Sequence, residues 1–400
     1  MAILARKNYG TPQPSGITQL SIIGMITALS AALMNTVWAI YMDSFFNSEV
    51  LVGLFSAFLT IIAIVTHFIF IPVIEKADKA KLYASSLLLF MVFYLIFAMN
   101  QSFIVMIIVA TLMTAFLALR ITSWGILVKD ASSKQGLSKN EGLVFTFSNM
   151  AFVIGPLIAG FISAQYGLRW VFVAAAAVLL IGFFFFKFSG IKGDGGKKRT
   201  DKDLYKNFID FFKNKDRIVA YLVGSGVTSW WILIYLFMPL HMIRNGFSDL
   251  AVGYFLFAVA VPLILLEYKF SKSAGKIGFR RVFKIGYLFV AIVAAACFFF
   301  TNLYVILGLL VIASVGMAML EPTTEAYFFD ILKGKERYRF YSPYGTSIDF
   351  GHLVSKISGA VLLIFLPFKF IFVLFAVWMF VLFFFSCKTR KVIEAKRRGI

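Results

Sequence analysis

Long apolar segments alternate with short polar breaks along almost the whole chain. A bilayer core about 30 Å thick needs about 20 apolar residues in each crossing helix, and the apolar segments reach about that length. They are continuously apolar and do not alternate, which favours helices over barrel strands. We therefore expect twelve transmembrane helices, at residues 17–42, 50–74, 82–99, 103–128, 143–165, 170–188, 218–242, 250–268, 282–300, 303–329, 344–366 and 369–387.

Composition supports the same fold class. Of the 400 residues, 60% are hydrophobic and 14% are charged, whereas a soluble protein has about 25% charged residues. The two cysteines, Cys297 and Cys387, lie in separate apolar segments, so they indicate neither a disulfide framework nor a metal site. We expect an all-α membrane protein with no cofactor, no metal and no enzymatic activity.

Basic residues set the expected orientation. They gather in alternate loops, for example at Lys76–Lys81 and Lys269–Lys284, while the intervening loops hold only Arg169, Arg244 and Lys369. Because basic loops stay in the cytoplasm, both termini are predicted to be cytoplasmic, which requires an even number of crossings. The net charge of +20 follows from this bias and not from nucleic-acid binding, since no basic stretch outside the apolar segments is interleaved with stacking aromatic residues.

The chain is predicted to consist of two related halves. The longest polar break separates a bundle at 17–189 from one at 217–387, with a tail at 1–16, a linker at 190–216 and a basic tail at 388–400. Within the linker, Leu204–Phe212 is amphipathic and predicts an interfacial helix. Similar features recur at an offset of about 200 residues, such as Asp130 with Asp330 and Ala159-Gly160 with Ser358-Gly359. Such repeats are common in transporters, whose binding site lies between them.

Several motifs resemble those of the major facilitator superfamily. They are the basic loops at Glu75–Lys81 and Gly275–Arg281, the segment Arg120–Gly125, and Gly155-Pro156-Leu-Ile-Ala-Gly160, which resembles the helix-five motif of antiporters. The resemblance implies twelve helices in two pseudo-symmetric bundles that rock around a central site. It also implies ion pairs that latch the cytoplasmic face, although topology alone explains the basic members. The expected latch residues are Glu75, Lys76, Asp78, Asp130, Lys276 and Asp330.

Ionisable residues inside apolar segments are the first candidates for function. An ionisable side chain at the bilayer centre costs at least about 2.5–3.5 kcal/mol. Asp349, His352 and Lys356 share one face of a predicted helix, because they are spaced by three, four and seven residues. Glu321 and Glu325 flank Pro322 in the helix at 303–329, and Arg120 lies in the helix at 103–128. We expect a proton-coupling carboxylate here, and a pair between Arg120 and one of the two glutamates. Permanent structural ion pairs, or a position near the membrane boundary, are the alternatives.

Other residues are less specific. By the resemblance, the first, fourth, seventh and tenth helices line a central cavity, and the repeat adds a position in the fifth. The resulting substrate-cavity candidates are Asn35, Trp38, Asn149, Thr228, Trp231 and Tyr235. For His67 we favour a packing role, and for Glu267 capping of the adjacent basic loop is a sufficient explanation.

These features predict a secondary transporter in the plasma membrane that acts as a monomer. Its expected partners are a small-molecule substrate, protons and the lipid bilayer. Proton-coupled efflux of a small amphipathic solute is the preferred interpretation, and symport or uniport of a polar solute such as a sugar or organic anion is the alternative. A non-transporting receptor or a lipid-modifying membrane enzyme would be a different class, but the chain shows no aspartate-rich metal motif.

Overall fold

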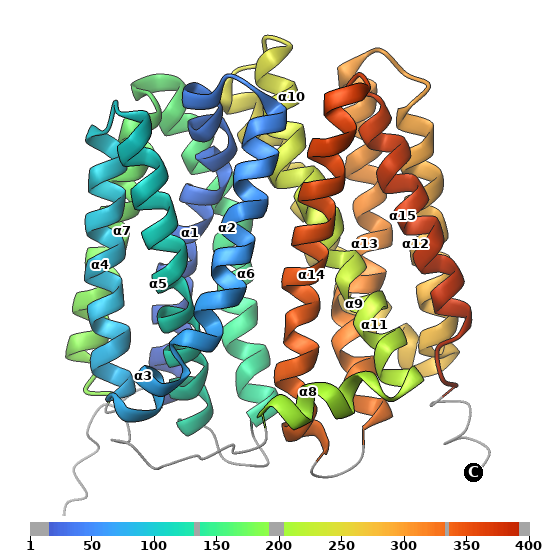
Figure 1. The fold of residues 1–400 in the computed structure, drawn as a ribbon, viewed down its shortest axis with the longest axis horizontal. Coiled ribbons are helices and arrows are strands. Elements are labelled where there is room, and N and C mark those ends of the chain that lie inside the picture. The colour runs from blue at the N-terminus through green and yellow to red at the C-terminus, as the bar shows by residue number, and fades with distance from the viewer. Residues whose placement is uncertain (1–15, 132–136, 192–203, 333–335, 392–400) are drawn as a thin grey trace, which may run out of the picture.

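The computed structural model describes residues 16–131, 137–191, 204–332 and 336–391, and within this part it is helical with no strand. Figure 1 shows two side-by-side bundles of upright helices, one blue to green and the other yellow-green to red. The first bundle contains α1 (Gly16–Phe46), α2 (Glu49–Ile69), α4 (Lys79–Met99), α5 (Phe103–Asp130), α6 (Leu137–Tyr166) and α7 (Leu168–Phe188). The second contains α9 (Lys215–Ile232), α11 (Asp249–Ile277), α12 (Phe279–Cys297), α13 (Leu303–Ile331), α14 (Glu336–Phe365) and α15 (Phe370–Cys387).

Short elements complete the chain. The π-helix η1 (Leu233–Phe237) and α10 (Met238–Arg244) continue α9, so that the three form one crossing. The short helix α3 (Ile71–Lys76) follows α2. The linker helix α8 (Leu204–Phe212) has the bounds that its amphipathic pattern predicts. Residues 1–15 and 392–400 of the predicted tails, and residues 192–203 of the predicted linker, lie outside the described residues.

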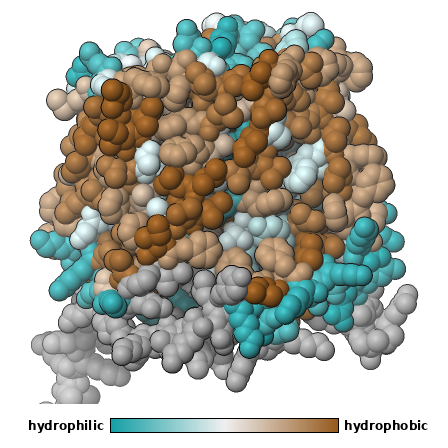
Figure 2. All heavy atoms as spheres, in the orientation of Figure 1, coloured by the Kyte–Doolittle hydropathy of each residue, from teal (hydrophilic) through white to brown (hydrophobic). Residues whose placement is uncertain are grey.

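Eleven helices of the described chain are long and apolar enough to cross a bilayer. The remaining upright helix, α12, begins with Arg280, Arg281 and Lys284, which reduces its apolar character, yet it packs between α13 and α15. Figure 2 shows a broad hydrophobic band with hydrophilic residues above and below it. The chain is an integral multi-pass membrane protein with the predicted twelve-helix architecture.

Several helices extend beyond their predicted apolar segments. The helix expected at 250–268 continues to Ile277, the one expected at 344–366 begins at Glu336, and the one expected at 143–165 begins at Leu137. Hydropathy marks only the part of a helix that lies in hydrocarbon, so polar turns beyond it escape detection. The segment expected at 50–74 instead divides into α2 and α3, and Pro72 opens the second helix because proline suits the first turn.

Internal symmetry is visible in how the two bundles touch. A Cβ added to Gly53 on α2 would lie 2.9 Å from Ala360 Cβ on α14, and one added to Gly160 on α6 would lie 3.0 Å from Gly253 Cα on α11. These four positions form two pairs offset by 200 residues, 53 with 253 and 160 with 360. The two crossings are therefore equivalent under exchange of the halves, and each depends on a small residue.

The two ends of the molecule differ. We call them the α8 end, where α3 and α8 lie, and the α10 end, where α10 lies (Figure 1). The helix termini at the α8 end carry many basic residues, among them Lys79, Lys276, Arg280 and Lys388. The α10 end carries Arg169, Arg244 and Lys369. The first and last described helices begin and end at the α8 end, as an even number of crossings requires.

Candidate functional site

A cluster of acidic and aromatic side chains lies inside the second bundle. The carboxyl group of Glu321 on α13 lies beside the indole of Trp231, and it is within electrostatic range of Glu267 on α11 and of the Tyr235 hydroxyl. Its Oε2 atom is buried and has no hydrogen-bond partner. The rings of Trp231 and Tyr235 have centroids 5.7 Å apart. By helix rise, Glu321 is about 15 Å from the end of α13, so the cluster is deep in the molecule.

Each of the three crossings that build this acidic-aromatic cluster is irregular. Tyr235 lies within η1, and Pro239 begins the next helix. Because proline has no N–H, it cannot bond the carbonyl of residue 235 in α-helical fashion, and the Met238 amide bonds Leu233 O instead. Pro322 directly follows Glu321 in α13, and Pro262 lies inside α11. π-helical turns and broken membrane helices often accompany functional sites.

A second group of ionisable residues lies between the bundles. Lys356 on α14 reaches α2 of the other bundle, where its Nζ donates to Thr60 Oγ1 at 2.9 Å and to Ser56 O at 3.3 Å. Asp349 lies within electrostatic range of Lys356 and of His67 on α2. His352 is also within range of Lys356. The predicted shared face of α14 is therefore turned towards α2, and His67 belongs to this group.

Arg120 lies inside the first bundle. Its guanidinium group is 4.9 Å from the centre of the Phe90 ring, and the hydroxyls of Tyr83 and Tyr94 are within electrostatic range. No ion pair joins it to a carboxylate among the described residues. The pair expected with Glu321 or Glu325 is thus not formed in this conformation. Glu325 is exposed and lies beside Tyr341.

The other predicted cavity residues differ in their surroundings. Asn35 is the one exposed residue of α1 between Ile17 and Asp43, although α1 is packed by elements of both bundles. Trp38, one turn away, packs on Tyr41 and Phe97. Thr228 donates to Ser225 O within α9 and lies against α14. Asn149 is half-buried on α6.

At the α10 end the two bundles are joined. Arg244 pairs with Asp43 at 2.7 Å and approaches Glu49 at 3.7 Å, and both carboxylates belong to the first bundle. Ser163 on α6 donates to Asp249 on α11. The helix-five motif supports this closure on both sides. A Cβ at Gly155 would lie 2.5 Å from Ala32 Cβ on α1, while Gly160 and the Pro156 carbonyl meet Gly253.

The predicted latch residues lie at the α8 end, at or near the ends of their helices. Asp78 caps its own helix by accepting from Ala80 N and Lys81 N. Lys76, Lys276 and Asp130 are exposed. Asp330 lies at the end of α13. Glu75 falls within α3, but its side chain lies outside the described part of the structure. The latch remains a prediction.

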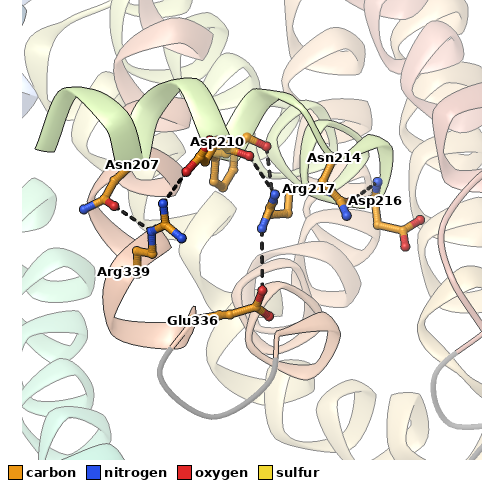
Figure 3. A network of polar contacts seen from close by, with 8 residues as sticks. Asn207, Asp210, Asn214, Asp216, Arg217, Glu336 and Arg339 are labelled. Carbon is orange, nitrogen blue, oxygen red and sulfur yellow. Dashed lines mark hydrogen bonds and ion pairs between the residues drawn. The ribbon is translucent and has the colours of Figure 1, made fainter. Parts of the chain in front are cut away.

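A polar network instead fixes α8 to the second bundle (Figure 3). Arg339 on α14 donates to Asn207 Oδ1 at 2.6 Å and pairs with Asp210. Arg217 on α9 donates to Asp210 O at 2.6 Å and approaches Glu336 at 3.9 Å. Hydrogen bonds from Lys213 and from Arg339 lower the pKa of the Asp210 carboxyl below its ordinary value.

Sequence reasoning missed two features of the site. Capping of the adjacent basic loop is the explanation that the sequence offers for Glu267, but its carboxyl group is within electrostatic range of Glu321. His67, which lies 200 residues before Glu267, is within electrostatic range of Asp349 between the bundles. The 200-residue offset could therefore have indicated that both positions belong to polar sites. The closing pair of Arg244 and Asp43 was also missed, because residues 201 positions apart are brought together only by bundle packing.

Comparison with known proteins agrees with this architecture. A family model described as Major Facilitator Superfamily matches residues 20–272 and 269–399. An uncharacterized MFS-type transporter of Methanocaldococcus jannaschii is 21% identical over 229 residues, or 56% of this chain. The chain spans 59% of the length of that relative.

Solved structures resemble the whole chain. A peptide transporter POT in complex with sulfate has a TM-score of 0.74 at 12% identity, covering 98% of this chain and 96% of that one. The nucleoside transporter NupG has a TM-score of 0.73 at 13% identity, covering 94% and 99%. A bacterial homolog of the human lysosomal transporter Spinster, inward-facing and unoccupied, has a TM-score of 0.72 at 12% identity, covering 96% and 98%. At these identities the likeness is one of fold.

Proposed function

The chain belongs to the Major Facilitator Superfamily, and on that basis we propose that it is a proton-coupled exporter of a small amphipathic solute. The family and the fold are those of membrane transporters. Proton coupling, direction and substrate are the proposed part, and the buried carboxyl group of Glu321 is the observation that carries them. We place the protein in the plasma membrane as a monomer, with the basic α8 end in the cytoplasm.

The contrast between the two ends supports alternating access. The α10 end is closed by Arg244 with Asp43 and by the crossing of Gly160 with Gly253. Asn35 is nevertheless exposed on the otherwise covered helix α1. A path from the α8 end accounts for this exposure. The proposed cycle breaks the contacts at the α10 end and forms the predicted latch at the α8 end, which exposes the same site to the other side.

Glu321 is the proposed proton carrier. Its buried Oε2 atom has no hydrogen-bond partner, and no ion pair reaches it among the described residues. A charged carboxylate in such surroundings is strongly disfavoured, so a proton is the simplest partner. Pro322 leaves the Ala318 carbonyl without its α-helical N–H donor, and the helix can adjust here when the bundles rock.

The experiment uses purified protein in proteoliposomes with an imposed pH gradient. Amphipathic fluorophores of positive, zero and negative charge are each tested for gradient-dependent flux. Glu321→Gln should abolish the dependence on the gradient, while Asp216→Asn, a change at the start of α9, should leave it intact. If the flux of all the fluorophores is independent of the pH gradient, proton coupling is refuted.

The alternative of a polar-solute symporter or uniporter rests on Lys356, a cation between the bundles. Symport would appear in the same assay as solute and protons moving together in one direction. Ligand binding with no flux under any gradient would instead indicate a receptor.

A further inference from the structure

The surroundings of Glu321 present negative charge from several directions. Two carboxyl groups, those of Glu321 and Glu267, come from packed helices α13 and α11. The indole of Trp231 lies beside Glu321, and the Tyr235 hydroxyl is within electrostatic range of it. The faces of both aromatic rings carry negative charge. The planes of these two rings are tilted by 52°, so their faces point in different directions.

The same three crossings also contain backbone carbonyl groups that lack their α-helical donors. Pro322 cannot donate an N–H to the carbonyl of Ala318, Pro262 cannot donate one to Ala258, and Pro239 cannot donate one to Tyr235. Carbonyl groups released in this way are used by membrane transporters to coordinate cations. Each of the three crossings that form the acidic-aromatic cluster thus contains one carbonyl group without its α-helical donor.

A balancing cation is missing from this cluster. Within the described residues, neither Glu321 nor Glu267 takes part in an ion pair. Lys356 instead donates to Thr60 and Ser56 at the interface with α2, and Arg120 lies among aromatic residues of the first bundle. The acidic-aromatic cluster is therefore a deep site whose fixed groups favour a positively charged guest.

We propose that this cluster binds an organic cation, a hydrophobic molecule with a single positive charge, as the transported solute. The assignment rests on the proposed transport function and names its substrate class. Aromatic faces attract diffuse organic cations, while a small metal ion needs more oxygen or nitrogen ligands. No group of three or more histidine, cysteine or acidic side chains suited to a metal occurs in the described chain.

The test compares two ions of the same shape and opposite charge. Tetraphenylphosphonium and tetraphenylborate are titrated by equilibrium dialysis against the full-length protein in detergent, with no gradient. The cation should bind saturably, and at least about tenfold more tightly than the anion. Glu321→Gln and Glu267→Gln should each weaken cation binding by about tenfold, the size of one good charge contact. Asp216→Asn should have no effect.

Two controls keep the outcomes separate. The melting temperature of each variant identifies misfolding, and Trp231→Leu tests the aromatic face without changing any charge, with weaker cation binding expected. Equal binding of the two ions, or unchanged binding in both glutamine variants, would overturn the proposed site. Cation binding without gradient-driven flux would confirm the site and refute only the proposed transport function. Proton-driven flux of other solutes without cation binding would confirm transport and refute the site.

Discussion

Replacing Gly253 by alanine should force the two bundles apart at the α10 end. A Cβ at this position would lie 2.5 Å from the Pro156 carbonyl oxygen and 3.1 Å from Gly160 Cα, both on α6. Ordinary contact begins at about 3.4 Å, so the helices must separate by about 0.9 Å. Both opposing groups belong to the backbone, so no side-chain rotation can relieve the clash.

The cost falls on one conformation. Overpacking of this kind costs about 1–3 kcal/mol, which corresponds to a change of about 5–150-fold in an equilibrium. An alternative state in which the α10 end is open does not contain this crossing and is spared the cost. The substitution should therefore populate an open α10 end that is rare in the parent protein.

Spin labels at Ser102 and Thr301, exposed residues of the first and second bundles, report the opening by pulsed distance measurement. Cys387, which is exposed, is first replaced by serine. Gly308→Ala is the matched control, because nothing lies within 4 Å of its added Cβ. A second population with a longer distance between the labels, seen in Gly253→Ala and not in Gly308→Ala, is the expected result. An unchanged distance distribution in both variants would refute the reasoning.

Four further predictions concern other contacts. Arg244→Ala should weaken closure of the α10 end by about 0.5–1 kcal/mol, the value of a partly exposed pair, and a double-mutant cycle with Asp43→Ala should show the coupling. Lys356→Met and Thr60→Val should likewise be non-additive in thermal unfolding, because the two side chains bond each other. Arg339→Ala should loosen α8, which Arg217 still holds through Asp210 O, and the loosening should appear as a more mobile spin label at Lys206, without unfolding of the bundles. Because the pKa of Asp210 is lowered, its ionised form supports α8 above its ordinary pKa, and this support should be lost only as the pH falls below about 4.

The sequence predicted the fold well because membrane insertion depends on local composition. Each crossing needs its own apolar segment, so the helices could be placed before any packing was known. The offset of 200 residues recurs in the paired crossings at Gly53 and Gly253, which were not predicted from the sequence. The polar extensions of α11 and α14 were not predicted, because hydropathy carries no signal outside the bilayer.

The site was harder to predict, because it depends on which faces of the helices meet. The spacing of Asp349, His352 and Lys356 placed them on one face, but it did not reveal that α2 covers that face. Arg120 and Glu321 could be paired only by assuming equal depth, and the structure places Arg120 against Phe90 instead. The π-helix at Leu233–Phe237 had only Pro239 as a signal, and a proline in a membrane helix does not specify a π turn.

A single cysteine at position 35 reports which end of the molecule is open, because Asn35 is the one exposed residue on the covered part of α1. Asn35→Cys, in a background without Cys387, is reconstituted in one orientation and treated with a membrane-impermeant maleimide from either side. We expect labelling from the α8 end in the resting protein, and additional labelling from the α10 end when Gly253→Ala is introduced. Labelling by a lipid-soluble reagent alone, or equally from both ends in the resting protein, would contradict this expectation.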